Sequence, residues 1–198
     1  MVEYEFNTED VFPSHIQSER LEFVPVHRTD ISVREMFQRY SSIPKENTSG
    51  VTFEPYENMS QAKEFREDSQ EEFETGQNAS YVLKLRETGE WIGVASLHIR
   101  WERHVAESGI YLFEEYWENG YGTERGEALL EIAFEEYNIE AWISRCAVDN
   151  TASQNSIEKY VVGNGGSKYG RTPNKQVGDQ LKDEYMYVIR REDYERSE

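Results

Sequence analysis

Residues 106–140 constrain the fold more than any other stretch of the chain. They read as an apolar strand over 108–113, a glycine-containing loop, and then an amphipathic helix. Gly120 and Gly122 in the loop have no Cβ, so we expect the backbone there to turn its N–H groups inward, beside the partial positive charge of the helix N-terminus. A strand, a glycine loop and a helix start in this order predict a phosphate-binding site.

The length of 198 residues, with 37% hydrophobic residues, indicates one domain with a sizeable core. No stretch approaches the roughly 18 apolar residues that a membrane helix needs, and the N-terminus has neither a basic head nor an apolar signal core. We therefore expect a cytoplasmic protein with no membrane contact. Residues 1–12 are polar and acidic without periodicity, so we expect a flexible arm followed by a single domain over 13–198.

The formal net charge of −18 argues against a nucleic-acid partner, because binding a polyanion requires clustered Lys and Arg. Such a charge suits a salt-adapted, halophilic protein, since salt screens self-repulsion, although an ordinary acidic protein is the simpler alternative. Cys146 is the only cysteine, which excludes an internal disulfide, and we expect it in the core. The four histidines lack metal-site spacing, so no metal is expected.

Hydrophobic periodicity and turn residues predict alternating strands and helices along the chain. The elements before the glycine loop are a strand over 19–26, a helix over 30–40 capped by Asp30, a loop with at most a short strand at 51–53, a helix from Ser60 to Gly76, and an antiparallel meander over 79–86, 90–101 and 106–113. The later elements are the helix after the loop, a strand over 141–148, a helix over 153–162 and a strand over 184–189.

Two nucleotide-binding families do not match the glycine loop. A P-loop needs Lys followed by Ser or Thr after its last glycine, and this chain has Thr123 and Glu124 there. A Rossmann fingerprint needs a third glycine where Arg125 stands, and an antiparallel meander does not precede a doubly wound sheet.

Over roughly residues 18–194 the chain resembles the GNAT superfamily of acyl-CoA-dependent N-acyltransferases, and within it the RimJ/RimL-like branch. The resemblance rests on segments 18–21, 89–93 and 106–112, and most specifically on Tyr-Trp-Glu-Asn-Gly-Tyr-Gly-Thr-Glu at 116–124 with Asn-Thr-Ala-Ser at 150–153. It implies an α/β (α+β) GNAT fold, in which a mixed, mostly antiparallel sheet splays at a CoA slot and about four helices flank it.

The resemblance also implies a cosubstrate, acetyl-CoA. The loop would hold the CoA pyrophosphate through backbone N–H groups, and pantetheine would pair with the strand beside the slot. A main-chain N–H near Ile110 or Tyr111 would stabilise the developing oxyanion. Arg125 would add a phosphate contact or be a solvated surface residue. The expected cosubstrate contacts are Ile110, Tyr111, Leu112, Trp117, Glu118, Asn119, Gly120, Tyr121, Gly122, Thr123, Arg125, Asn150 and Ser153.

The implied activity is transfer of an acetyl group to a primary amine, either a protein N-terminus or a small-molecule amine. Glu107 is the candidate base, directly or through water, or else an ion-pair partner at the strand end. Ser153 would protonate the CoA thiolate or cap its helix. Tyr169 stands where relatives often carry Glu, and it would be a pocket wall or a substitute acid; Ile157 stands where many relatives carry a tyrosine as general acid. A non-catalytic CoA-binding or regulatory module is the alternative, and a homodimer is left open.

Overall fold

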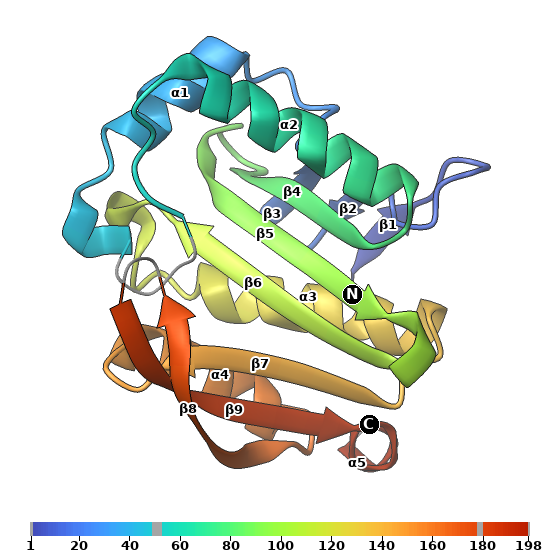
Figure 1. Cartoon of the computed structure of the whole chain (residues 1–198). Helices are drawn as coiled ribbons and strands as arrows, with labels where there is room; N and C mark the ends of the chain where they lie inside the picture. The colour runs from blue at the N-terminus through green and yellow to red at the C-terminus, as the bar shows by residue number, and fades with distance from the viewer. Residues whose placement is uncertain (1, 49–52, 178–179, 198) are drawn as a thin grey trace.

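The computed structural model describes residues 2–48, 53–177 and 180–197, which form one nine-stranded sheet with helices on both faces (Figure 1). The strand order is β1-β2-β3-β4-β5-β6-β7-β9-β8, and every neighbouring pair is antiparallel except β6 and β7. The strands are β1 Glu3–Glu5, β2 His15–Gln17, β3 Leu21–Pro25, β4 Asn78–Leu85, β5 Trp91–Arg100, β6 Val105–Leu112, β7 Ala141–Ala147, β8 Ser167–Val177 and β9 Gln180–Arg190.

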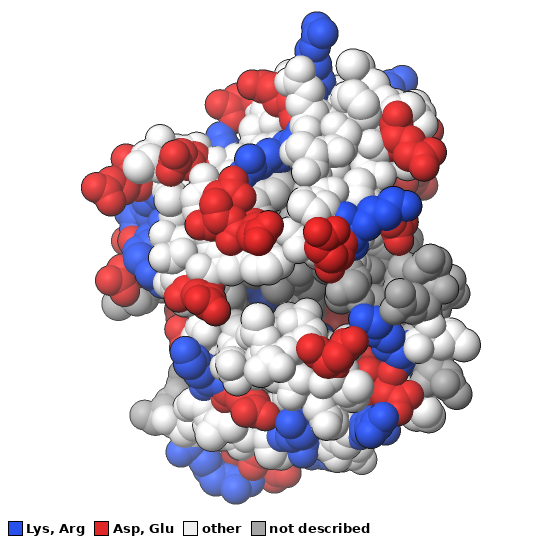
Figure 2. Space-filling view, turned by 90° about the vertical axis from the view of Figure 1, so that its left-hand side faces the viewer, with Lys and Arg blue, Asp and Glu red and all other residues white. Residues whose placement is uncertain are grey.

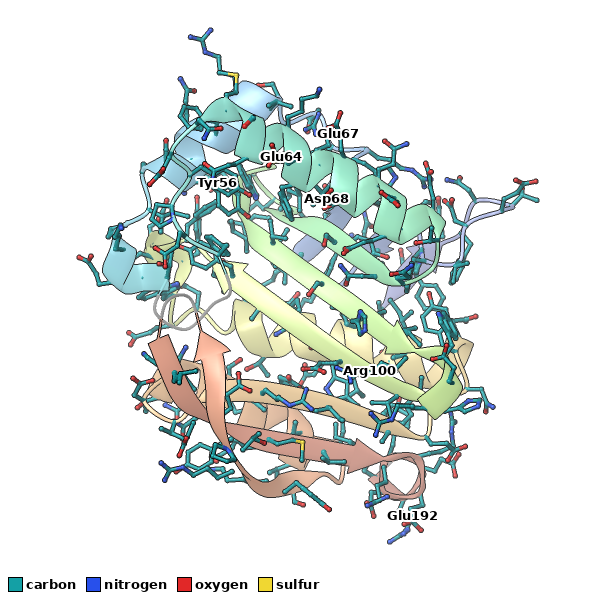
Figure 3. The ribbon with its side chains drawn as sticks, in the orientation of Figure 1. Tyr56, Glu64, Glu67, Asp68, Arg100 and Glu192 are labelled. Atoms are coloured by element: carbon teal, nitrogen blue, oxygen red, sulfur yellow. The ribbon has the colours of Figure 1, made fainter. Side chains whose placement is uncertain are left out.

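The helices divide between the two faces. In Figure 1, α1 and α2 lie over the upper part of the sheet, and α3 and α4 lie behind it. The helices are α1 Val33–Ser41, α2 Met59–Glu74, α3 Tyr121–Glu136, α4 Thr151–Gly163 and α5 Arg191–Ser197, with short 3-10 turns at Lys45–Thr48, Trp101–Arg103 and Glu114–Tyr116. Figure 3 marks Glu64, Glu67 and Asp68 along α2, whose solvent face is acidic.

Strand alternation separates two apolar cores. On β6, Ala106 and Ile110 pack with the core under α3 and α4, while Tyr111 joins the core under α1 and α2. This is the period of two expected of a strand covered on both faces. Cys146 is buried in the larger core, as predicted.

Strands β6 and β7 pair only at their beginnings. Their parallel register covers Val105 to Glu107 against Ala141 to Ile143, whereas β5 accompanies β6 along its full length and β9 accompanies β7. Beyond that register, 108–112 of β6 and 144–147 of β7 diverge, and we call this opening the fork. The predicted splayed, mixed and mostly antiparallel sheet is confirmed.

The N-terminal segment differs from the expected flexible arm. Glu3–Glu5 forms β1 and pairs with β2, and Phe12 is fully buried against Phe73, with ring centroids 5.7 Å apart. Backbone pairing does not require apolar side chains, so this polar segment carries no periodicity that would reveal its strand. One aromatic side chain then anchors its end.

Three helix starts differ from the prediction. Ser32, not Asp30, caps α1 through a capping box with Glu35, because the Asp30 carboxylate pairs with Lys84 at 2.5 Å. Asn58 caps α2, and Asn150 caps α4. A fifth helix follows the sheet among the described residues.

The carboxyl-terminal part of the sheet is larger than the single strand that the sequence predicts. It adds β8 and extends β9 on both sides of the expected strand over 184–189. The short strand expected at 51–53 lies largely outside the described residues.

Candidate functional site

The two loop glycines serve different purposes. Gly120 is the N-cap of α3 at φ 82°, in the left-handed region that favours glycine, and its carbonyl accepts from the N–H groups of Thr123 and Glu124, both at 3.1 Å. Gly122 lies inside α3, where a Cβ would come within 2.8 Å of Ser156 Oγ on α4. Gly120 therefore shapes the turn, whereas Gly122 permits the two helices to pack closely.

The loop is tied back to the end of β6. Trp117 Nε1 donates to the Leu112 carbonyl at 2.7 Å, and Asn119 Nδ2 donates to the Trp117 carbonyl at 2.8 Å. Between them, Glu118 has a positive φ of 62°, which is uncommon for a residue with a Cβ. These contacts hold the predicted phosphate loop at the open end of the fork.

Arg20 locks the same loop, a contact that sequence reasoning missed. Its Nη1 donates to the Asn119 carbonyl at 2.9 Å, and its Nε donates to Glu124 at 2.7 Å. Partial burial opposes ionisation of Glu124, but hydrogen bonds from Ser18 and from Arg20 outweigh it and lower the pKa of that carboxyl group. Arg20 belongs to the segment 18–21 that carried the resemblance, although nothing in that segment shows its long-range partner.

A cavity of about 270 Å³ lies at the start of α3. Arg20, Gly120 and Thr123 line it, together with Lys159 from α4 and three glutamates. A larger hollow of about 500 Å³ on the outer face of α4 shares Lys159. Figure 2 faces the side where the fork opens and shows the surface hollowed between the upper and lower parts of the molecule. The first cavity combines a helix N-terminus and two cations, one of them paired with Glu124, with the carboxylates of the three glutamates.

The candidate base Glu107 is the last residue of β6 that pairs with β7. Its half-buried carboxylate forms an ion pair with Arg145 of β7 and a longer contact, 3.4 Å, with Arg100, which ends β5 and is labelled in Figure 3. The structure thus places Glu107 at the closed end of the fork. It also supplies the ion pair that was the alternative interpretation.

Asn150 and Ser153 lie at the start of α4, directly after β7. The Asn150 side chain caps the helix by accepting from the Ser153 N–H at 3.0 Å, so Asn150 is the cap and Ser153 is a half-buried residue of the first turn. Because β6 leads into α3 and β7 leads into α4, both helix starts flank the open end of the fork (Figure 1).

Tyr169 lies apart from this group. It occupies a bulge in β8 and is 65% exposed, with β9 and β7 between β8 and the fork. Of the other predicted contacts, 110–112 lie on β6 within the fork, and 117–123 lie in the loop and the first turn of α3. The structure therefore brings the loop, Asn150 and Ser153 to the open end of the fork, places Glu107 at its closed end, and leaves Tyr169 outside the fork.

Arg125 is neither a phosphate contact at the surface nor a solvated residue, and both expectations are corrected. It is 3% exposed, and its Nη1 donates to Ser108 Oγ on β6 at 2.7 Å. Its position in the helix faces the sheet, so its side chain points beneath the fork and away from the cavity.

The comparisons with known proteins agree with this geometry. The model of the Acetyltransferase (GNAT) domain matches residues 20–160, and the chain therefore belongs to the GNAT acetyltransferase family. An uncharacterised N-acetyltransferase of Bacillus subtilis, YnaD, is 28% identical over 120 residues, which is 60% of this chain and 69% of that protein.

Solved structures share the fold at lower identity. A GNAT acetyltransferase from Bacillus anthracis has a TM-score of 0.72 and 22% identity, over 90% of this chain and 99% of that chain. The RimL ribosomal L7/L12 alpha-N-protein acetyltransferase in complex with CoA has 0.73 and 19%, over 87% and 95%. The Vibrio cholerae spermidine N-acetyltransferase in complex with CoA and spermine has 0.71 and 18%, over 89% and 99%.

Residues 2–48, 53–177 and 180–197 contain neither a candidate membrane-spanning helix nor a candidate metal cluster. None of the helices in those ranges is both long and apolar enough to cross a membrane. Within the same residues, no three His, Cys, Asp or Glu side chains gather as a metal site would require.

Proposed function

We propose that the protein is an acetyl-CoA-dependent N-acetyltransferase that moves an acetyl group to a primary amine by direct attack in a ternary complex. The observation that carries this proposal is the fork, whose open end meets the N-terminus of α3 and its cavity. An extended pantetheine arm fits along an unpaired strand edge, and a phosphate group fits at a helix start. GNAT family membership supports the same cosubstrate.

Local groups must overcome the charge of the whole protein. CoA carries about four negative charges, and the net charge of −18 repels it at long range. Salt screens that repulsion over about 8 Å at physiological strength, so direct contacts dominate. The N–H groups of 120–122, with Arg20 and Lys159 beside them, are the contacts we assign to the pyrophosphate.

The reaction would form a bond between the amine nitrogen and the acetyl carbon and break the bond from that carbon to sulfur. The amine must be neutral to attack. The pKa of an α-amino group, near 8, lies about one unit above pH 7, whereas the pKa of a lysine-like amine, near 10.4, lies more than three units above it, so deprotonating the second amine costs more free energy. Glu107, directly or through water, would take the proton that the amine loses. A β6 N–H near Ile110 or Tyr111 would stabilise the oxyanion, and Ser153 would protonate the departing thiolate.

Several finer features stay predictions. The acceptor is a protein N-terminus or a small-molecule amine; the relatives named above act on L7/L12 and on spermidine, which are examples of both classes. The RimJ/RimL-like branch, salt adaptation, a cytoplasmic location and a homodimer belong to the same proposal. Tyr169 as an acid would require approach from a partner or a moving segment, because it is exposed outside the fork.

A second candidate is a non-catalytic CoA-binding module. The observation that favours it is the double ion pair of Glu107 with Arg145 and Arg100, which already engages the carboxylate proposed as the base. The two candidates share the cosubstrate and differ in turnover.

The experiment is a thiol assay of CoA release from acetyl-CoA over a panel of protein N-termini, amino acids and polyamines. We expect release above background with at least one amine and a product heavier by one acetyl group. CoA release at background across the panel, with acetyl-CoA binding intact, would favour the non-catalytic CoA-binding module over the enzyme. Glu107→Gln should lower the rate and leave binding intact, and an unchanged rate would remove Glu107 as the base.

A further inference from the structure

Arg125 is a buried cation without an anionic partner. Its side chain is 3% exposed, and within residues 2–48, 53–177 and 180–197 no carboxylate forms an ion pair with it. Its Nε is also buried without a hydrogen-bond partner there. Burial lowers the pKa of the guanidinium, against an opposing effect of Tyr160. Buried charges are normally paired, so this one calls for an explanation.

Arg125 and Tyr160 lie between the two strands of the fork, and each forms a hydrogen bond with one of them. Arg125 Nη1 donates to Ser108 Oγ at 2.7 Å, and the guanidinium lies near the Tyr160 hydroxyl of α4, which favours its charged form. Tyr160 in turn shares a 2.6 Å hydrogen bond with Ser144 Oγ. Ser108 and Ser144 are the first residues of β6 and β7 beyond the last paired positions. We call the four residues Ser108, Arg125, Tyr160 and Ser144 the brace.

The brace lies under the closed end of the fork, on the side of α3 and α4. Ser144 is 1% exposed and also accepts from Trp142 Nε1 at 2.9 Å, so its hydroxyl has a fixed position. Gly126 lets the Tyr160 ring approach α3, because a Cβ there would lie 2.5 Å from that ring. The sequence thus leaves space for this contact between the two helices.

A buried polar connection of this kind is expensive in stability. Replacing buried ionic groups by apolar ones of similar size is often neutral or stabilising, so folding alone does not require Arg125. Two diverging strand edges, by contrast, leave backbone groups unpaired and would tend to close on each other. A rigid spacer between them opposes that closure.

We propose that the brace sets the separation of β6 and β7 at the fork, and that Arg125 is a positioning residue for acetyl-CoA. This inference rests on the proposed function, because the fork is the slot assigned to the pantetheine arm. Arg125 acts through Ser108, which precedes the β6 N–H groups assigned to the thioester oxygen. Losing the brace disturbs the slot without touching the phosphate cavity.

The test compares Arg125→Met, Arg125→Lys and Tyr160→Phe with the wild-type protein. We expect Arg125→Met to weaken acetyl-CoA binding at least tenfold by calorimetry, while its melting temperature stays the same or rises. Arg125→Lys should recover part of the affinity. Tyr160→Phe removes one hydroxyl and keeps the ring, so it tests the brace even where Arg125→Met fails to fold.

Arg191→Met is the matched control. Arg191 is a half-buried arginine that pairs with Glu195, and it donates to the carbonyls of Ile139 and Phe134 away from the fork. We expect this variant to lose stability and keep its acetyl-CoA affinity. Affinity within twofold of wild type in both Arg125→Met and Tyr160→Phe would overturn the proposal.

Hydrogen exchange of the free protein separates failure of the brace from failure of the proposed function. Without the brace, we expect faster exchange of the amides of 108–112 and 144–147, with the rest of the sheet unchanged. If the wild-type protein binds no acetyl-CoA, the proposed function fails, and this exchange pattern still decides whether the brace holds the fork. Unchanged exchange in both variants would overturn it.

Discussion

Gly120→Ala tests whether the turn before α3 is shaped for a phosphate ligand. Gly120 has φ 82°, a conformation that costs a residue with a Cβ about 1–2 kcal/mol. The new methyl group would meet only Arg20 Nη2, at 3.5 Å, so there is no clash in the folded protein. We expect a stability loss of about 1–2 kcal/mol, and about 2–4 °C in melting temperature for each kcal/mol in a chain of this size.

Gly89→Ala is the matched control. Gly89 has φ 72° in the turn between β4 and β5, and a Cβ there meets nothing within 4 Å, so the conformational cost is the same. Both variants should lose similar stability by circular dichroism. Only Gly120→Ala should also bind acetyl-CoA more weakly by calorimetry, by at least tenfold, or about 1.4 kcal/mol. Equal affinities in the two variants would refute the assignment of the turn.

Three further predictions concern the base, the helix contact and pH. Glu107→Gln should lower kcat about tenfold or more with unchanged acetyl-CoA affinity, as steady-state kinetics would show. Gly126→Ala should cost about 1–3 kcal/mol in urea unfolding, because its Cβ would lie 2.5 Å from Tyr160. The ring nitrogens of His27 are buried without a hydrogen-bond partner among the described residues, and burial lowers the pKa of this side chain. The contribution of His27 to the free energy of unfolding is therefore complete above about pH 6.5 and falls as the pH drops below that value. His27→Phe should reduce this pH dependence of the free energy of unfolding.

Much of the fold follows from local patterns in the chain. Strands β4, β5 and β6 alternate apolar residues on both faces and are separated by clear turns, so the meander was predictable. The helix after the glycine loop has a long apolar face and was also predictable. The prediction that β6 diverges from β7 rested on the family resemblance alone, because pairing between strands leaves no local pattern in the sequence.

Other features depend on contacts between distant residues. The pairing of β1 and the extent of the β8 and β9 hairpin rest on backbone bonds between polar segments, which show no apolar period. Arg20 reaches Glu124, and Arg125 faces the sheet because of its angle on α3. A charged residue in the first turn of a helix is expected at the surface, and for Arg125 that expectation is wrong.

The central claim is that the fork and the start of α3 bind acetyl-CoA. Thermal unfolding of the full chain, in salt that keeps it folded, measures this directly, because a ligand that binds only the native state stabilises it. At about 100 times its dissociation constant, acetyl-CoA should add about 2.7 kcal/mol, which raises the melting temperature by several degrees. No shift at millimolar acetyl-CoA would contradict the account.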